Sequence, residues 1–229
     1  MQVQTKDATE TLPKFDGLRY NRLLKRMHIA LAPNWYLEVG TFSGKSLALA
    51  KCNTVAVDPK FKIQNPVINN TGKEMFFFQQ TSDEFFASPL LARNKIRFDF
   101  AFLDGLHKFE FLLRDFMNTE KVMAKDGVIA LHDCCPSTYE MAVREPRPGK
   151  WTGDVWKTLL ILLRHRPDLD IQVANSQPTG LVVVRNLDAR SQVLEKNYDD
   201  LLAEYSPMTL ENLDRGLAGL YDNFEVKSP

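Results

Sequence analysis

Carboxylates and imidazoles stand together in two short segments of this 229-residue chain. The segment LDGLH places Asp104 and His107 just past the end of a predicted strand, and ALHDC places His132 and Asp133 at the end of the next one. Neighbouring parallel strands end at the same edge of a sheet, so we expect these side chains to face one cleft. Two carboxylates and two imidazoles gathered in this way predict a divalent-metal site, an acid/base site, or both.

A turn with two glycines, within YLEVGTFSGKS, is the second candidate site. Gly40 and Gly44 permit a tight turn and leave space in which an extended cofactor can lie against the main chain. The spacing excludes a dinucleotide fingerprint, because Thr41 and Phe42 stand where G-x-G-x-x-G needs its second glycine. It also excludes a P-loop, because Val39 occupies the first glycine position of G-x-x-x-x-G-K-[ST].

Hydrophobic periodicity predicts the elements that position these residues. Short apolar runs bounded by turn residues predict seven strands, over 35–40, 54–59, 75–80, 97–105, 126–133, 170–175 and 180–186. Apolar residues at helical spacing predict helices over 19–31, 46–51, 82–94, 109–116 and 156–163, and two further helical stripes over 194–205 and 210–224.

The alternation of strands and helices, closing with an antiparallel pair at the edge, predicts a doubly wound α/β fold. We expect a mostly parallel seven-stranded sheet with helices on both faces and an antiparallel last strand. A mass of 26.2 kDa suits one α/β domain over 1–229. Within it we expect an N-terminal helical extension over 1–33, a core over 34–186 and C-terminal helices over 187–229.

In this turn an acidic residue, Glu38, is followed two residues later by Gly40 and four residues after that by Gly44. This spacing resembles the first motif of the class I methyltransferases, which use S-adenosylmethionine. In these Rossmann-like enzymes the carboxylate reaches the methionine end of the cofactor and the glycines approach it through their backbone, roles that fall on Glu38, Gly40 and Gly44. Asp58 matches the acidic residue on the cofactor ribose, where a carboxylate can accept from both hydroxyls. Ser82 stands where family members often contact adenine. The implied cofactor-binding residues are Glu38, Gly40, Thr41, Gly44, Asp58, Ser82 and Asp104.

The Asp and His pairs resemble those of metal-dependent O-methyltransferases of the family 24 type, which act on sugars and other natural products and include the macrolide sugar methyltransferases. The resemblance implies metal ligation by Asp104, His132 and Asp133, with His107 as general base. The chain departs from the pattern at His132, where these relatives have a carboxylate. Because imidazole suits Mn, Fe or Zn better than Mg²⁺, either the metal differs or His132 is the base and no metal binds.

The segment WTGDVWK, before a predicted helix, adds candidates for the substrate entrance. It resembles a branch of bacterial family members that joins HDCxP to GDVWK and is typed as methyltransferase. Trp151, Asp154 and Lys157 are expected to line the entrance, with Lys157 as a further candidate base. Trp156, at helical spacing, is expected in the core.

Purely structural roles remain alternatives for three of these residues. His107 could cap the following helix, and Asp133 could turn the chain before Pro136. Asp58 could be a turn residue before Pro59.

Composition excludes several function classes. Lys plus Arg and Asp plus Glu are both 29, so the formal net charge is zero and no overall field would hold a nucleic acid. Apolar runs such as TLLILL fall far short of the ~20 residues that span a bilayer, and the first residues lack a secretory pattern. We therefore expect a cytoplasmic protein without nucleic-acid or membrane partners. Cys52, Cys134 and Cys135 form no CxxC pair and are expected to be thiols.

The expected activity is S-adenosylmethionine-dependent O-methylation of a small hydroxylated acceptor, such as a sugar or glycan-linked metabolite. The expected cofactors are S-adenosylmethionine and, where a metal binds, Mg, Mn or another divalent ion. Alternatives are a hydroxylase-like or nucleotide-sugar-modifying enzyme on the same fold, or a non-catalytic cofactor-binding module. The stripes over 194–205 and 210–224 would cover the core or pair two copies as a homo-oligomer.

Overall fold

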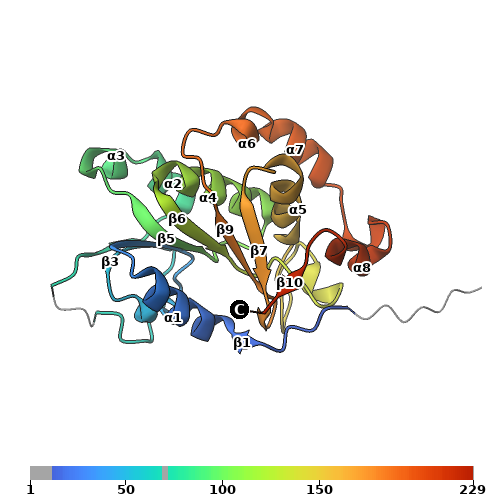
Figure 1. The fold of residues 1–229 in the computed structure, drawn as a ribbon, viewed down its shortest axis with the longest axis horizontal. Coiled ribbons are helices and arrows are strands. Elements are labelled where there is room, and N and C mark those ends of the chain that lie inside the picture. The colour runs from blue at the N-terminus through green and yellow to red at the C-terminus, as the bar shows by residue number, and fades with distance from the viewer. Residues whose placement is uncertain (1–11, 69–71, 229) are drawn as a thin grey trace, which may run out of the picture.

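The fold is built on an eight-stranded sheet with the order β10-β7-β9-β6-β5-β2-β3-β4 (Figure 1). A computed structural model describes residues 12–68 and 72–228. The sheet strands are β2 (Trp35–Val39), β3 (Asn53–Val57), β4 (Met75–Phe78), β5 (Phe98–Leu103), β6 (Met123–Leu131), β7 (Asp170–Ala174), β9 (Leu181–Arg185) and β10 (Val226–Lys227). The two-residue strands β1 (Leu18–Arg19) and β8 (Ser176–Gln177) pair with each other apart from this sheet.

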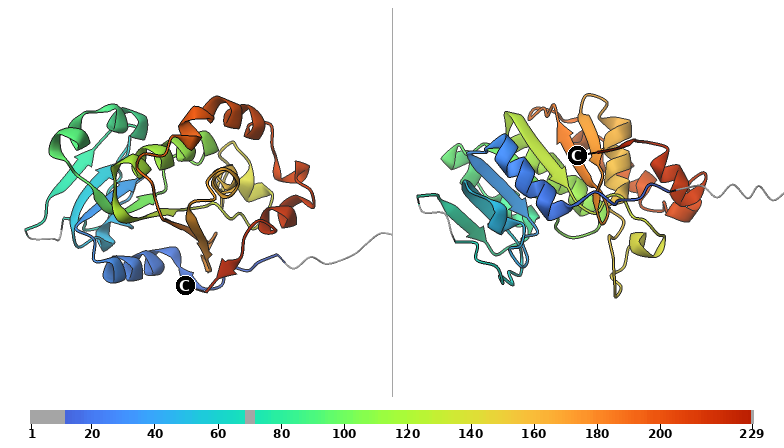
Figure 2. Two further views of the ribbon diagram at one scale, coloured as in Figure 1. Left: turned by 45° about the horizontal axis from the view of Figure 1, so that its top comes forward. Right: turned by 60° about the horizontal axis from the view of Figure 1, so that its bottom comes forward.

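Helices connect the strands and cover both faces of the sheet. The α-helices are α1 (Tyr20–Leu31), α2 (Ser82–Ala87), α3 (Leu90–Asn94), α4 (Phe109–Val122), α5 (Trp156–His165), α6 (Val193–Lys196), α7 (Tyr198–Tyr205) and α8 (Gly216–Tyr221). Three 3₁₀ turns are η1 (Leu47–Leu49), η2 (Glu140–Ala142) and η3 (Leu210–Asn212). In Figures 1 and 2, α1 lies on one side of the sheet and α4 and α5 lie on the other.

The central strands are apolar on both faces, which is what a parallel sheet covered by helices requires. In β5, Ala101 and Leu103 belong to the core beneath α4 and α5. Phe100 and Phe102, which alternate with them, belong to the core beneath α1. Each core is thus supplied by alternate residues of the same strand, as the two-residue repeat of a β-strand dictates.

The predicted doubly wound fold is confirmed. All seven expected strands are present, and β9 is antiparallel to both β6 and β7 while the other pairs in the large sheet are parallel. The sheet has an eighth strand because the C-terminal tail, expected to be helical, returns as β10 and pairs with β7. Positive φ angles at Arg215 and Gly216 interrupt the expected helical stripe before α8.

Two expected helices are shorter than predicted. The segment over 46–51 forms only the 3₁₀ turn η1, because Ala50 is already extended and leads the chain into β3. The segment over 82–94 is divided into α2 and α3, because Ser88 is extended ahead of Pro89, as a residue before proline prefers. Residues 1–11 of the expected N-terminal extension lie outside the described residues.

The C-terminal helical stripes pack against this chain's own core. Leu201, Tyr205, Leu217 and Leu220 are buried there with residues of α4 and α5. A homo-oligomer formed through these helices stays a prediction. None of the helices within 12–68 and 72–228 is long and apolar enough to cross a membrane. The three cysteines are buried free thiols, as expected.

A buried ion pair joins α4 to the end of α5. The Arg166 guanidinium donates to both carboxylate oxygens of Glu120, at 2.7 Å each, and both side chains are almost completely buried. Asp168 also pairs with Arg166 at 2.8 Å, but its side chain is 48% exposed. The Glu120 pair is therefore the fully buried one, and its loss leaves the buried Arg166 guanidinium with only the half-exposed carboxylate of Asp168.

Substitution Glu120→Gln is expected to lower the free energy of unfolding by about 3 kcal/mol, because the buried guanidinium loses its buried counter-charge. Asp168→Asn is the matched control and is expected to cost at most about 1 kcal/mol, since that pair faces water. Urea unfolding followed by circular dichroism measures both. Equal losses in the two variants would contradict this account.

Candidate active site

A cavity of about 660 Å³ opens at the carboxyl ends of β2, β3 and β5. It lies where the strand order reverses, since the chain runs outward from β2 through β3 to β4 and then continues at β5 on the other side of β2. Such a reversal is the usual ligand site of an open α/β sheet. The cavity is lined by Val39, Gly40, Phe42, Val57, Asp58, Pro59, Ser82, Asp104, Gly105, Leu106, His107, His132, Asp133 and Trp151.

The glycines of the first turn are required by the packing of the chain itself. Gly40 has a φ of +87°, and a β-carbon there would overlap with the backbone of Asp104. Gly44 has a φ of +74°, and a β-carbon there would press on Val67. Gly40 nevertheless lines the cavity, so its backbone is available to a ligand. Gly44 is turned towards Val67 and is not among the lining residues.

Asp58, at the end of β3, holds the same turn in place. One of its carboxylate oxygens accepts from the backbone N–H of Phe42 and the other from that of Lys60, both at 2.7 Å. Each oxygen keeps a lone pair for a further donor. The side chain is only 7% exposed, yet it lines the cavity. Its position is suited to a ligand that offers hydroxyl groups.

Glu38 lies behind the turn instead of facing the cavity. Its fully buried carboxylate accepts from the Tyr36 hydroxyl at 2.7 Å and from the Ser46 hydroxyl at 3.0 Å. Burial raises its pKa to about 7, partly offset by these hydrogen bonds. Thr41 is likewise buried and is not a lining residue. Two of the predicted cofactor residues therefore support the turn from below.

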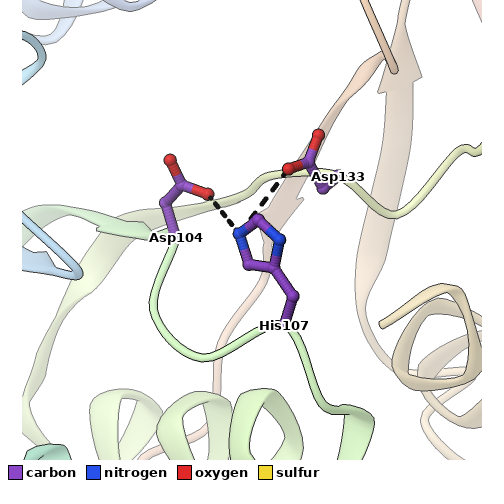
Figure 3. Close-up of side chains that lie close together, drawn as sticks. All are labelled: Asp104, His107 and Asp133. Atoms are coloured by element: carbon purple, nitrogen blue, oxygen red, sulfur yellow. Dashed lines mark ion pairs between the residues drawn. The ribbon is translucent and has the colours of Figure 1, made fainter. Parts of the chain in front are cut away.

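The two Asp and His pairs meet in one cluster, as their strand-end positions predict. His107 Nε2 lies 3.4 Å from Asp104 Oδ1 and 3.6 Å from Asp133 Oδ2 (Figure 3). His132 Nδ1 lies 3.2 Å from the same oxygen of Asp104 and 3.3 Å from that of Asp133. Asp104, His107 and Asp133 present possible ligand atoms that all lie within 4.8 Å of one another.

Opposite charges control the protonation of this cluster. Burial lowers the pKa of His132, but Asp104 and Asp133 more than offset it and raise that pKa to about 10. The pKa of His107 is also raised, because the same carboxylates outweigh its burial. Burial acts to raise the pKa of Asp104, yet the two imidazoles hold it well below its usual range. The carboxylates thus favour positive charge between them.

Two residues that the sequence did not single out, Thr179 and Tyr20, complete the cluster together with Trp151. The Thr179 hydroxyl donates to Asp133 Oδ1 at 2.7 Å and so leaves Oδ2 for the imidazoles. The Trp151 ring stacks on the His107 ring at 5.2 Å, and the Tyr20 ring lies 4.2 Å from that of His132. Thr179 comes from the loop before β9, far from either pair in the sequence. Its place beside Gly180 indicates only a turn and gives no signal of a contact with Asp133.

The segment WTGDVWK positions the His107 loop. A β-carbon at Gly153 would overlap with the carbonyl oxygen of His107, so the two loops cross in close contact. Asp154 caps α4, since its carboxylate accepts from the backbone N–H of Phe109 at 3.0 Å. It also pairs with buried Lys157 at 3.0 Å. Of the predicted entrance residues, only Trp151 lines the cavity, and Trp156 is in the core as expected.

Lys157 faces a different and smaller cavity of about 260 Å³. Asp154, Trp156 and residues that follow α7 line this space with it. The structure therefore separates Lys157 from the cluster of Asp104, His107, His132 and Asp133, with Asp154 as its ion-pair partner. A lysine in this place supports the helix cap.

Asp115 of α4 lies behind the cavity wall formed by Ser82 and Gly105. Its side chain is 2% exposed, and Oδ1 has no hydrogen-bond partner among the described residues. Burial raises its pKa to about 7, with a hydrogen bond from Ser82 acting in the opposite direction. Its neighbours on α4 predicted only an amphipathic helix, so this buried carboxyl was not anticipated.

The fold and the cavity are those of open α/β proteins, whose ligands bind at the carboxyl ends of the strands where the strand order reverses. A family model described as a methyltransferase domain matches residues 37–134. This range includes the glycine turn, Asp58 and both Asp and His pairs. No protein with curated functions matches the chain significantly by sequence.

Several solved methyltransferase structures share this fold. An O-methyltransferase from Bacillus cereus, in complex with S-adenosylhomocysteine, is 14% identical with a TM-score of 0.56, covering 77% of this chain and 84% of its own. The O-methyltransferase TomG from Streptomyces achromogenes, involved in tomaymycin synthesis and in complex with S-adenosylmethionine, is 16% identical with a TM-score of 0.53, covering 74% and 80%. Methyltransferase PaMTH1 from Podospora anserina, bound to S-adenosylhomocysteine, is 14% identical with a TM-score of 0.50, covering 74% and 78%.

Residues 37–134 thus match a methyltransferase domain, and the sheet has the fold of solved methyltransferases bound to S-adenosylmethionine or S-adenosylhomocysteine. The resemblance predicted from the glycine turn is thereby confirmed at the level of the enzyme class. The roles of individual residues and the acceptor are matters of proposal.

Asp115 predicts a pH dependence of stability. A carboxyl whose pKa is about 4 when unfolded and about 7 when folded lowers stability as the pH rises between these values, by up to about 1.4 kcal/mol per pH unit. Asp115→Asn removes this titration. The variant is therefore expected to lose less stability than the wild type between pH 5 and pH 8, while the parallel contribution of Glu38 remains. Urea unfolding at both pH values measures the difference, and parallel losses would refute it.

Proposed function

We propose that this chain transfers the methyl group of S-adenosylmethionine to a hydroxyl oxygen of a small acceptor. The observation that carries the proposal is that one cavity is lined both by the turn residues Gly40 and Asp58 and by the cluster around His107. A methyl donor held by the former places its reacting end towards the latter. The solved O-methyltransferases with this fold support oxygen as the methylated atom.

The cofactor would lie along the ends of β2, β3 and β5. Asp58 has an acceptor site on each oxygen for the ribose hydroxyls, and the open backbone of Gly40 permits close approach. Ser82, at the start of α2, borders the part of the cavity that we propose for adenine. Exposed apolar side chains of Phe42 and Leu106 supply walls for the adenosyl and methionine groups.

The cluster fits a divalent cation. The carboxylates of Asp104 and Asp133 both lie close to imidazole nitrogens, and without a metal their negative charges favour protonated imidazoles between them. Two carboxylates and an imidazole are ligands suited to Mn, Fe or Zn. We propose His132 as the third ligand, because its Nδ1 lies nearest to both carboxylate oxygens. A bound cation would lower the pKa of the acceptor hydroxyl and orient it.

His107 is the proposed proton acceptor. Its side chain is 22% exposed and lines the cavity, whereas that of His132 is 7% exposed, so His107 is the imidazole that can return a proton to water. As the acceptor oxygen forms its bond to the methyl carbon, the carbon–sulfur bond breaks and its electrons stay on sulfur, giving S-adenosylhomocysteine. The hydroxyl proton would pass to Nε2 of the neutral form of His107, the form that a cation bound between the two carboxylates would favour over the imidazolium. Trp151 holds the ring in place by stacking.

A sugar or glycan-linked metabolite is the acceptor that we propose within the class of small hydroxylated molecules. The support is the likeness of the Asp-x-x-His element and the following acidic pair to those of sugar O-methyltransferases. Trp151 offers an aromatic face at the edge of the cavity, against which a sugar ring can pack.

Two variants separate cofactor binding from transfer. His107→Ala is expected to bind S-adenosylhomocysteine within about twofold of wild type and to lose transfer by a factor of about 10² to 10⁴, the usual contribution of a general base. Asp58→Asn is expected to weaken binding about tenfold or more, because hydrogen bonds to a charged group are lost. Calorimetry measures binding, and transfer of a labelled methyl group to metabolites from a cell extract measures activity.

Controls distinguish a loss of cofactor binding from a loss of folding. Thermal unfolding of the Asp58 variant is measured alongside, since this carboxylate also anchors the turn at Phe42. Tight binding of NADH or ATP in preference to S-adenosylhomocysteine would overturn the proposal. Unchanged methyl transfer by His107→Ala would indicate that His132, and not His107, accepts the hydroxyl proton.

Metal binding has its own test. The wild type, stripped with a chelator and dialysed against Mn²⁺, is expected to retain about one ion per chain by elemental analysis, and Asp133→Ala is expected to retain none. The reason is that Asp133 and Asp104 supply the anionic ligands that a hard or borderline cation needs. Glu110→Ala, a carboxylate paired with Arg144 outside the cavity, is the matched control and should retain the ion. Equal retention by all three proteins would rule out this site.

A further inference from the structure

A second, basic cavity lies directly beside the catalytic cluster. It has a volume of about 250 Å³ and is lined by Arg19, Tyr20, Asn21, Lys45, Lys150, Gln177 and Pro178. Its wall towards the active site is an aromatic contact, since the ring of Tyr20 lies 4.2 Å from the ring of His132. A molecule that reached both cavities would therefore pass around a single ring.

Three cations line this cavity without any carboxylate among its described lining residues. The side chains of Arg19, Lys45 and Lys150 form no hydrogen bond or ion pair with another described residue. The nearby acid in the chain, Asp16, is engaged by the amide of Asn175 at 2.9 Å. This differs from Arg114, which has a carboxylate partner at 2.8 Å. Unpaired cations that share one cavity favour an anionic ligand.

Each cation belongs to a segment that also builds the active site. Lys45 follows the last glycine of the first turn, and Lys150 immediately precedes Trp151, which stacks on His107. Arg19 precedes Tyr20, the residue in contact with His132. The basic cavity thus borders the side of the site that holds His107 and His132.

We propose that the acceptor carries an anionic group, a phosphate or a carboxylate, which Arg19, Lys45 and Lys150 bind while its hydroxyl lies beside His107. Charge-assisted hydrogen bonds from a guanidinium and two ammonium groups are the strong contacts that such a group makes. Binding the anion at a distance from the reacting oxygen fixes the orientation of the acceptor, which is how binding remote from the chemistry assists transfer. This inference rests on the proposed function and specifies its substrate class.

Another cavity lined by lysines provides the control. Lys25, Lys51 and Lys73 line a space of about 390 Å³ with Pro33 and Cys52, at the ends of β2 and β3 opposite to the active site. Removing two of these charges changes the net charge of the protein by the same amount as removing Lys45 and Lys150. General electrostatic attraction is therefore matched in the two double variants.

The test titrates sodium pyrophosphate into the protein saturated with S-adenosylhomocysteine, with inorganic phosphate and citrate as further arms. Pyrophosphate is expected to bind the wild type and the Lys25→Gln/Lys51→Gln variant equally, and the Lys45→Gln/Lys150→Gln variant at least tenfold more weakly. Stronger binding of the phosphates than of citrate indicates a phosphorylated acceptor, and the reverse order indicates a carboxylate. Equal weakening in both variants, or no binding of any of the three anions to the wild type at millimolar concentration, would overturn the proposal.

Affinity for S-adenosylhomocysteine is measured first in all three proteins. It is expected to be the same within about twofold, because the substituted side chains lie outside the proposed cofactor position. If the wild type does not bind S-adenosylhomocysteine, the proposed function itself is contradicted. If it binds S-adenosylhomocysteine but none of the anions, only the proposal of an anionic acceptor is contradicted. In a labelled extract, the methylated product should be retained by an anion-exchange column at pH 7, and a neutral product would count against the proposal.

Discussion

The close crossing of two loops, the turn after β2 and the segment after β5, sets the geometry of the whole site. No β-carbon fits at Gly40 because the backbone of Asp104 occupies that space. The backbone N–H of Asp104 in turn donates to the carbonyl of Val39 at 2.9 Å. The glycine turn and the first carboxylate of the cluster are therefore held together, and their separation follows from the register of β2 and β5.

Electrostatic balance explains how four ionisable groups can stand together at a nearly buried strand end. Each carboxylate faces two imidazoles, and the raised pKa values of His107 and His132 keep positive charge between Asp104 and Asp133. Two unneutralised carboxylates in this space would repel each other at a high cost in free energy. The same requirement for positive charge is what makes the cluster suited to a divalent cation.

Much of the fold was predictable, because strand ends, glycines and apolar periodicity are local signals. The meeting of Asp104, His107, His132 and Asp133 followed from their places after neighbouring parallel strands. What could not be predicted depends on contacts between distant segments. Lys157 follows a motif near the site, but α5 directs its side chain to Asp154. Glu38 points to the face of the sheet covered by α1, because side chains alternate between the two faces along β2. Thr179 reaches Asp133 only through the tertiary fold.

The contact between Gly153 and His107 has a consequence for how such an enzyme could change its acceptor. The loop that ends at Gly153 carries Lys150 and Trp151 at the acceptor entrance, and it also presses on the backbone of the proposed base. Changes in this loop that reshape the entrance would therefore move His107 as well, so selectivity and rate would alter together.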